Sequence, residues 1–512
     1  MNFMKLLRTI SKSFIGRTVA VAFSPPLQLF SATLFYYFSL YFSINNRTLF
    51  LLTFLYWLVI FRLTKNFKLS LFAGLLATLL FPKGRAYQLL LLPKESIERW
   101  VLFDISYFFP VYLADIFLGV LGYLYLRNKT IVTSIGATLK KLQPFWWLAL
   151  FIIWVVFSGT LSVAPEVSWL SALQLVRMMA LMVLPLLLFA HQKTQLKKLV
   201  LSVALAALLF ESSWVIAQRI SGGPLGKDLE VYLPGAQFGI LASEDLGLLR
   251  VTGTFFEPSI LGTFLLMQMA IILPLVLRKR HTDQRHILNT LGWFGLGVGS
   301  VALIFTGSRI LYGVWLWLAG LTWWFWRKNK PNLNFKNHPK LFAGTVVVAL
   351  IVATALAPYL TRRLETLTDV FTQYGSGTYR LAMIQYAARL ALGNPWFGVG
   401  INLSPYYFAT EFTGEQLVFD PTYPHNLLFQ LLAETGMVGA FFFFMLVYTT
   451  VRPFFLYLKQ SVIKEYSLAV GIYVLCAMFY PIFLNHPELS SYFFLYAGLS
   501  TLSRKQARVD RA

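Results

Sequence analysis

Residues 421–439, PTYPHNLLFQLLAETGMVG, join a polar turn to the first residues of a long apolar run. Asn426 can cap a helix that begins after it, because its side-chain oxygen can accept from the first free backbone N–H groups. Leucines form one face of this helix, whereas Asn426, Gln430 and Glu434 recur every four residues on another face. The pattern predicts a helix that enters a membrane from a polar surface.

The rest of the chain has the composition of a polytopic membrane protein. Of its 512 residues, 57% are hydrophobic, 17% are aromatic and only 13% are charged, which is too apolar for several soluble domains. The formal net charge of +23 could indicate a nucleic-acid partner. The cations, however, lie in short loops between apolar runs, so we expect no nucleic acid as a partner.

About fourteen transmembrane helices are predicted, since a bilayer core requires about 20 mainly apolar residues per helix. The predicted fold is therefore all-α. The candidate spans are 27–44, 48–61, 69–82, 104–126, 143–161, 169–190, 199–218, 257–277, 287–305, 309–326, 341–357, 436–451, 467–484 and 489–502.

Lysine and arginine indicate the orientation of these spans, because cytoplasmic loops are rich in both. With both termini in the cytoplasm, the inside segments hold 30 of the 44 Lys and Arg residues. No cleaved signal peptide is expected, because no short apolar region is followed by a small-residue cleavage site.

The predicted topology divides the chain into five parts. They are helices 1–7 in residues 1–218, an outside loop in 219–256, helices 8–11 in 257–357, a large outside loop in 358–424, and helices 12–14 in 425–512. Long connections in compact proteins are usually functional or disordered. Residues 377–393 in the large loop have helical periodicity, so we expect a helical cap there.

Three stretches on the outside face carry polar groups at the ends of spans. The first contains Arg250 and Glu257, the second is the short turn at 305–311 with Arg309, and the third contains His425. Glu257 before a proline is suited to helix capping, so a structural and a catalytic interpretation both remain open. For Arg309, snorkelling to the membrane surface and binding of an anion are both consistent with the sequence.

The predicted position of His425 favours a chemical role over a simple cap. If the helix continues unbroken from His425 to Val451, it is about 40 Å long and exceeds a bilayer core of about 30 Å. His425 would then lie exposed at the outer surface, on the same side as Arg250 and Arg309. A neutral histidine can accept a proton near pH 7, and arginine forks suit a pyrophosphate leaving group.

Charged residues also occur inside the predicted spans. Asp115, Arg177 and Glu211 lie at similar predicted depths. We interpret Arg177 as the partner of Glu211 or Asp115 in a buried ion pair, in preference to a proton path.

The outside stretches, taken in order, resemble the O-antigen ligase/polymerase superfamily of bacterial inner-membrane glycosyltransferases. The matching features are R-x-x-G-T-F-x-E-P-S from Arg250, T-G-S-R ending at Arg309, S-G-T-Y-R ending at Arg380 followed by N-P-W-F-G-V-G, and H-N-x-x-x-Q-x-x-A-E-T-G from His425. The resemblance covers about residues 200–450. Ile310 stands where many relatives have glycine.

The resemblance implies a glycosyltransferase C-like fold in the inner membrane and a reaction at its periplasmic face. His425 would activate the acceptor hydroxyl, Arg250 and Arg309 would hold the pyrophosphate of an undecaprenyl-linked glycan, and Arg380 would be a further basic residue of the large loop. Supporting positions are Asn426, Glu257 and Glu434. The implied partners are this donor and membrane lipids, with chain-length regulator and flippase proteins as further candidates. No metal or other cofactor is expected.

Four functions remain open from the sequence. The first hypothesis is a polymerase that joins lipid-linked repeat units, with inversion at the anomeric carbon. The alternatives are an O-antigen ligase acting on a lipid A core, a protein O-oligosaccharyltransferase, and a polysaccharide flippase or other transporter. A transporter commonly has repeated halves and broken helices near the midplane, whereas the polar groups here gather on one face.

Overall fold

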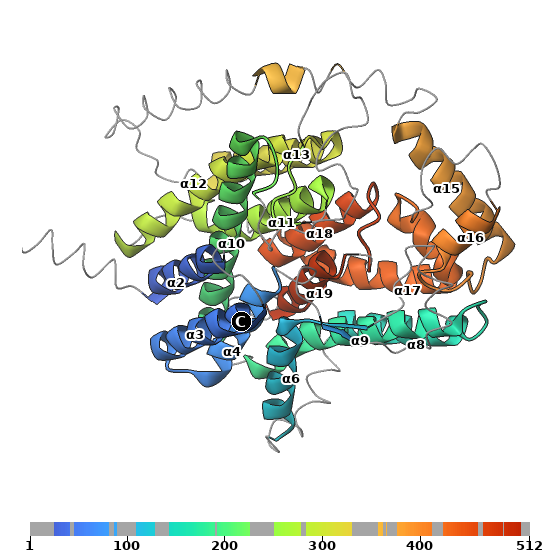
Figure 1. Ribbon diagram of the computed structural model, residues 1–512, viewed down its shortest axis with the longest axis horizontal. Helices are drawn as coiled ribbons and strands as arrows, with labels where there is room; N and C mark the ends of the chain where they lie inside the picture. Colours follow the sequence, from blue (N-terminus) through green and yellow to red (C-terminus); the bar gives the residue numbers. More distant parts are fainter. Residues whose placement is uncertain are drawn as a thin grey trace, which may run out of the picture.

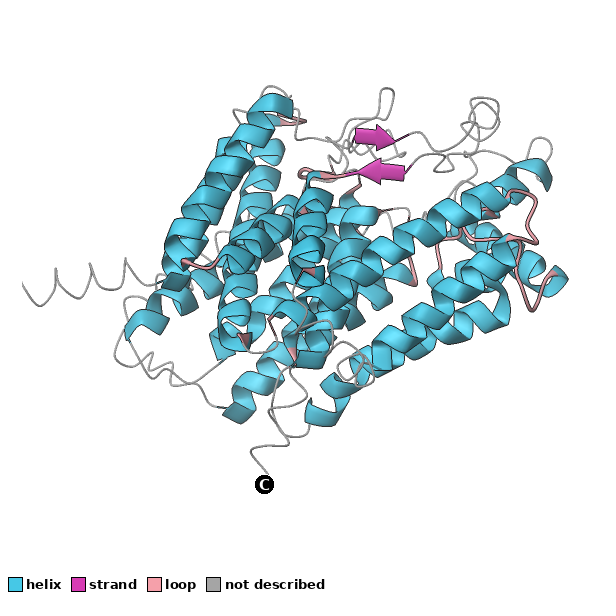
Figure 2. Cartoon of the chain, turned by 90° about the horizontal axis from the view of Figure 1, so that it is seen from below, coloured by secondary structure: helices cyan, strands magenta, loops and turns pink. Residues whose placement is uncertain are grey.

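The computed structural model shows a bundle of helices with a small pair of strands at one edge (Figures 1 and 2). It describes residues 25–40, 46–80, 87–89, 109–127, 143–189, 192–225, 250–255, 257–277, 283–329, 357–361, 365, 376–411, 423–458, 464–484 and 486–502.

The elements of the described residues follow the apolar runs of the sequence. They are α2 (Pro25–Ser39), α3 (Asn46–Thr64), α4 (Phe67–Thr78), β1 (Tyr87–Leu89), β2 (Phe109–Val111), α6 (Leu113–Leu126), α8 (Gln143–Gly159), α9 (Pro165–Leu188), α10 (Lys193–Ser221), α11 (Pro258–Leu277), α12 (Asp283–Phe305), α13 (Arg309–Asn329), α15 (Ser376–Gly393), α16 (Ser404–Glu411), α17 (Leu427–Leu458), α18 (Glu465–Ala477) and α19 (Pro487–Leu502).

A described helix of the elements above overlaps every predicted span except 341–357, of which residues 341–356 lie outside the described residues. Five candidate membrane spans in the described part are long and apolar enough to cross a membrane. They are Pro165–Leu188, Lys193–Ser221, Pro258–Leu277, Leu288–Phe305 and Leu427–Leu458. The structure therefore has the character of a helical membrane protein, and the number fourteen stays a prediction.

The predicted all-α character is confirmed, and one short pair of strands is added to it. Within the predicted span 104–126, Phe109–Val111 form β2 and α6 begins at Leu113. Strand β2 pairs antiparallel with β1, and Gln88 lies opposite Pro110 (Figure 2). Pro110 lacks a backbone N–H and disfavours the helical conformation in the residue before it, so the helix begins only after this strand.

The helices pack around α10 and around the pair α8 and α9. In Figure 1, α10 runs from top to bottom through the left half of the bundle, and it contacts α2, α11 and α12. Helix α9 packs on α8 and α19, and α17 packs on α8 and α18. These contacts bury large side chains such as Phe210 and Tyr473, whereas one side of α8 exposes apolar residues such as Ile153, as expected of a surface that faces lipid.

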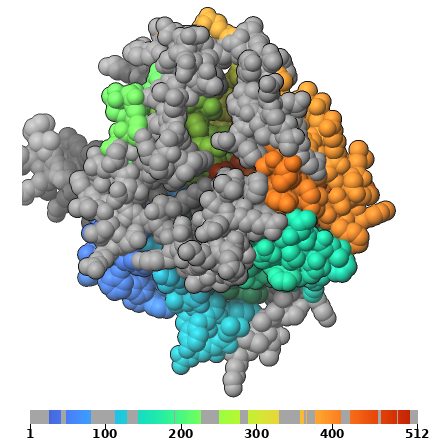
Figure 3. Space-filling view, turned by 45° about the vertical axis from the view of Figure 1, so that its right-hand side comes forward, coloured from blue at the N-terminus to red at the C-terminus, as the bar shows by residue number. Residues whose placement is uncertain are grey.

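A second, smaller core forms at the end of the bundle where α17 begins. Helix α15 coincides with the predicted helix at 377–393, and it packs on α17. Its Tyr386 and Leu390 are buried against Phe408 of α16, Val167 of α9 and Ala433 of α17. Figure 3 shows the orange surface of this region directly beside the teal surface of α8 and α9.

Helix α17 contains a break that the sequence analysis did not anticipate. Gly436 has φ 67° and ψ −176°, so the helix is not continuous from His425 to Val451. The break frees carbonyl groups of the preceding turn, and other segments satisfy them. The N–H groups of Val399 and Gly400 donate to the carbonyls of Ala433 and Glu434 at 2.8 and 3.0 Å. The N-P-W-F-G-V-G stretch is therefore fixed to the break by backbone hydrogen bonds.

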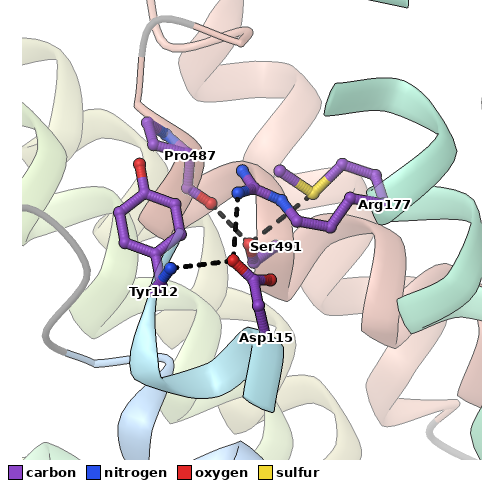
Figure 4. A network of polar contacts seen from close by, with 6 residues as sticks. Tyr112, Asp115, Arg177, Pro487 and Ser491 are labelled. Carbon is purple, nitrogen blue, oxygen red and sulfur yellow. Dashed lines mark hydrogen bonds and ion pairs between the residues drawn. The ribbon is translucent and has the colours of Figure 1, made fainter. Parts of the chain in front are cut away.

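The buried ion pair forms between Arg177 and Asp115, with 3.5 Å between Nη1 and Oδ2 (Figure 4). Asp115 also accepts from the backbone N–H of Tyr112 at 2.8 Å, and the Arg177 guanidinium lies 4.8 Å from the centroid of the Tyr112 ring. The pair thus joins α6 to α9. Glu211, the other partner that the sequence allowed, bonds instead to Thr254.

Candidate active site

The first and second predicted stretches lie in direct contact. The Arg250 Nε donates to the carbonyl of Thr306 at 3.0 Å, and the Val251 N–H donates to the carbonyl of Phe305 at 3.2 Å. Among the described residues, no carboxylate pairs with Arg250. The two terminal nitrogens of its guanidinium are therefore available to an anion.

Helix α10 holds the turn that follows Arg250. Gln218 donates to the Gly253 carbonyl and accepts from the Gly253 N–H, both at 2.9 Å. The Glu211 carboxylate accepts from the hydroxyl of Thr254 at 2.5 Å and from its N–H at 3.1 Å. Gly253 has φ 62°, and a Cβ there would lie 2.5 Å from Glu211 Oε2. The turn therefore requires glycine at this position and fixes the direction in which Arg250 extends.

The second stretch is a tight turn between α12 and α13. Gly307 has φ 64°, and a Cβ on it would lie 3.0 Å from the Arg250 Cγ and 2.9 Å from the Tyr359 hydroxyl. The hydroxyl of Ser308 hydrogen-bonds to that of Tyr480, in the connection between α18 and α19. Arg309 is the first residue of α13 and is partly exposed.

The third stretch begins α17 beside the same connection. Asn426 caps the helix as predicted, since its Oδ1 accepts from the N–H groups of Leu428 and Phe429 at 3.0 and 3.2 Å. Its Nδ2 donates to the carbonyl of Met478 at 3.0 Å, which joins the helix start to the end of α18. Asn426 thus determines where His425 lies.

His425 is partly exposed, and its Nδ1 is buried with no hydrogen-bond partner among the described residues. Its ring lies 5.9 Å from that of Tyr379 in an edge-to-face arrangement, and it hydrogen-bonds to the backbone of Phe479. Burial, followed by the charge of Arg380, lowers the pKa of His425 to about 4, although Glu257 and the hydrogen bond to Phe479 oppose the shift. The imidazole is therefore neutral at pH 7 and can accept a proton.

Arg380 and Glu257 belong to the same cluster as His425, because the charges of both act on its titration. The Arg380 guanidinium lies over the Tyr480 ring, with Cζ 5.3 Å from the centroid. Glu257 precedes the first residue of α11, and its carboxylate accepts from the Ser259 hydroxyl at 2.9 Å. This position suits a capping role and also places a negative charge near the histidine.

Glu434 lies in the core, on the turn of α17 just before the break at Gly436. It is fully buried, accepts from the Ser404 hydroxyl at 2.7 Å, and lies 3.4 Å from the Gln430 amide. Its contacts fix the large-loop segment against α17. The supporting role of Glu434 stays a prediction.

Three contributors to the cluster were missed from the sequence: Gln218, Ser308 and Tyr480. Gln218 lies at the end of an apolar run, where it could have been noticed as an uncharged polar residue beside the outside loop 219–256. Ser308 lies in the short turn at 305–311, where a serine is an ordinary turn residue. Tyr480 precedes Pro481, which indicates the end of a helix, but nothing local distinguishes it from the other tyrosines of a chain that has 25.

Comparison with known proteins shows what part of the chain is similar to a described family. A family model described as O-antigen ligase matches residues 294–444, a region that contains Arg309, Arg380 and His425. The resemblance to the O-antigen ligase/polymerase superfamily is confirmed. Arg250 and Glu257 lie outside the matched region, so their place beside the superfamily residues rests on the contacts described above.

A candidate polysaccharide ligase of Rickettsia conorii is 25% identical over 201 residues. The alignment covers 36% of this chain and 40% of that relative, so the chain matches about two fifths of its length. Together with the superfamily match, this relative supports a ligase- or polymerase-type role in a multi-pass membrane protein.

Proposed function

We propose that this protein is a glycosyltransferase that takes its glycan from undecaprenyl pyrophosphate at the periplasmic face of the bacterial inner membrane. The observation that carries the proposal is the cluster itself. A neutral histidine with a buried, unpartnered Nδ1 lies beside Arg380, and Arg250 and Arg309 extend from turns that contact each other. The cluster can therefore bind a pyrophosphate and accept a proton at one place.

The reaction follows from these groups. An acceptor hydroxyl attacks the anomeric carbon while its proton passes to the imidazole of His425. The bond between that carbon and the pyrophosphate oxygen breaks, and the lipid pyrophosphate leaves with the bonding electrons. Arg250, Arg309 and Arg380 stabilise the negative charge that develops on it, since their planar forks can each donate two hydrogen bonds. A single displacement of this kind inverts the anomeric configuration.

For the acceptor, we propose the terminal sugar of a second lipid-linked repeat unit, which makes the protein a polymerase. A ligase that transfers the glycan to another acceptor is the second candidate. It is favoured by the names of the matching family and of the Rickettsia relative, since both names contain the word ligase.

The test supplies purified protein with one defined undecaprenyl-pyrophosphate-linked repeat unit and resolves the products by length. The polymerase hypothesis expects a ladder of products that differ by one repeat unit. A single product that forms only after a lipid A core or a protein acceptor is added would favour the ligase or the protein-directed transferase. Movement of the donor across vesicles without bond formation would contradict the enzyme and indicate a transporter.

A further inference from the structure

Residues 478–480, between α18 and α19, contact three of the four stretches that form the candidate active site. The carbonyl of Met478 accepts from Asn426, and the backbone of Phe479 hydrogen-bonds to His425. The Tyr480 side chain contacts Arg380 of the large-loop helix and Ser308 of the turn before α13. This connection therefore organises the cluster although it lies outside the region matched by the superfamily.

Tyr480 makes one contact with its aromatic ring and another with its hydroxyl group. Its ring lies under the Arg380 guanidinium, at a distance within the range of cation–π interactions. Its hydroxyl hydrogen-bonds to Ser308, the residue before Arg309. The side chain is 6% exposed, so both contacts are shielded from solvent. One buried tyrosine thus links an arginine of the large-loop helix to the turn that starts α13.

The contact with Tyr480 bears on where Arg380 points. Among the described residues, Arg380 has neither a hydrogen bond nor an ion pair, and the Tyr480 ring is the one aromatic group on which its guanidinium lies. A cation stacked on a ring keeps its N–H groups directed sideways, and they remain free to bind an anion. An aliphatic side chain at position 480 would leave Arg380 free to turn towards solvent.

We propose that Tyr480 is a positioning residue of the lipid-pyrophosphate site: its ring orients Arg380, and its hydroxyl fixes the turn that carries Arg309. The inference rests on the proposed function, because the anion that the two arginines bind is the pyrophosphate of the donor. Tyr480 itself transfers no proton and makes no bond in the reaction.

The test separates the ring from the hydroxyl. Tyr480→Phe keeps the ring, and we expect it to lower kcat/KM by about the same factor as Ser308→Ala, with no further loss in the double variant because both remove one bond. Tyr480→Leu removes the ring as well, and we expect a further loss of about 10-fold. In an Arg380→Gln background, the Leu and Phe variants should become equal, because the ring then has no guanidinium to orient.

Tyr496→Phe is the matched control. Tyr496 is a fully buried tyrosine of α19 whose hydroxyl donates to Gln268 Oε1 of α11 at 2.9 Å. We expect this variant to lose thermal stability like Tyr480→Phe while keeping its kcat/KM. A purely structural Tyr480 would lower stability without any coupling to Arg380.

Two outcomes separate the inference from the function on which it rests. If the wild-type protein transfers glycan and the Phe and Leu variants differ by the same factor with and without Arg380, the positioning role is wrong and the proposed function stands. If the wild-type protein forms no glycosidic bond from the lipid-linked unit, both are wrong. If Tyr480→Leu does not fold, the Tyr480→Phe/Ser308→Ala double variant still tests the role of the hydroxyl. No further loss in the double variant supports that role, and losses that add up contradict it.

Discussion

Replacing Gln218 with methionine tests whether α10 positions Arg250. The two side chains have similar length, so the packing of α10 should persist while both hydrogen bonds to Gly253 are lost. Gln218 is fully buried, which leaves the N–H and the carbonyl of Gly253 without partners or water. Each such group costs about 1–3 kcal/mol, so the native turn is destabilised by at least about 2 kcal/mol.

The loss of these two hydrogen bonds affects activity if the turn at Gly253 moves to a position where its N–H and carbonyl find new partners, because Arg250 then moves with it. Because 1.36 kcal/mol corresponds to a factor of ten, about 2 kcal/mol lowers the ratio of molecules with Arg250 in place to molecules with the turn displaced by roughly 30-fold. We expect kcat/KM for the lipid-linked donor to fall by up to this factor, while the protein remains folded and inserted. The assay measures initial rates of glycan transfer in detergent or vesicles, together with thermal unfolding.

Gln268→Met provides the control for this prediction. Gln268 is equally buried in α11, and its Oε1 accepts from the Tyr496 hydroxyl at 2.9 Å, away from the arginines. It should lose stability and keep its kcat/KM. If Gln218→Met retains transfer within about threefold of wild type, or if both variants lose the same activity, the positioning of Arg250 by α10 is refuted.

Three further predictions concern charge, pH and topology. Arg309→Lys should impair transfer strongly, because a point charge cannot replace a planar fork that binds two oxygens; wild-type kinetics would remove Arg309 from the site. Because burial and Arg380 lower the pKa of His425 to about 4, the imidazole stays neutral as the pH falls through 6.5, and transfer should continue there. Protonation of His425 should inhibit transfer only near pH 4. Arg380→Gln removes a charge that lowers this pKa, so the acid limb should move to higher pH in pH–rate profiles; an unchanged limb would contradict the contact. A reporter active only outside the cytoplasm should be active when fused at residue 400 and silent at 333, and the reverse pattern would invert the topology.

The helices were predictable from the sequence because each depends on a local property. A run of about 20 apolar residues predicts a membrane span whatever helices pack beside it. Asn426 predicts a helix start because its own side chain can cap the helix. The polar stretches around Arg250, Arg309 and His425 were recognised for the same reason. Each stands out against an apolar background within a single window of the chain.

The partners of these residues depend on how distant helices pack, which no single window reports. The sequence left Arg177 with two candidate carboxylates, and only the packing of α6 against α9 selects Asp115. The break at Gly436 was not predicted, since glycine is tolerated in helices and the compensating N–H groups come from a loop about 35 residues earlier. Tyr480 was missed because its importance lies entirely in contacts with Ser308 and Arg380.

The most direct test of the central claim counts two products of the same reaction. Purified wild-type protein and His425→Ala receive the same lipid-linked repeat unit, and glycosidic bonds formed and undecaprenyl pyrophosphate released are measured together. We expect one lipid pyrophosphate for each bond in the wild type, and neither product from a His425→Ala protein that is folded and inserted. Bond formation without release of lipid pyrophosphate, or undiminished transfer by His425→Ala, would contradict the account.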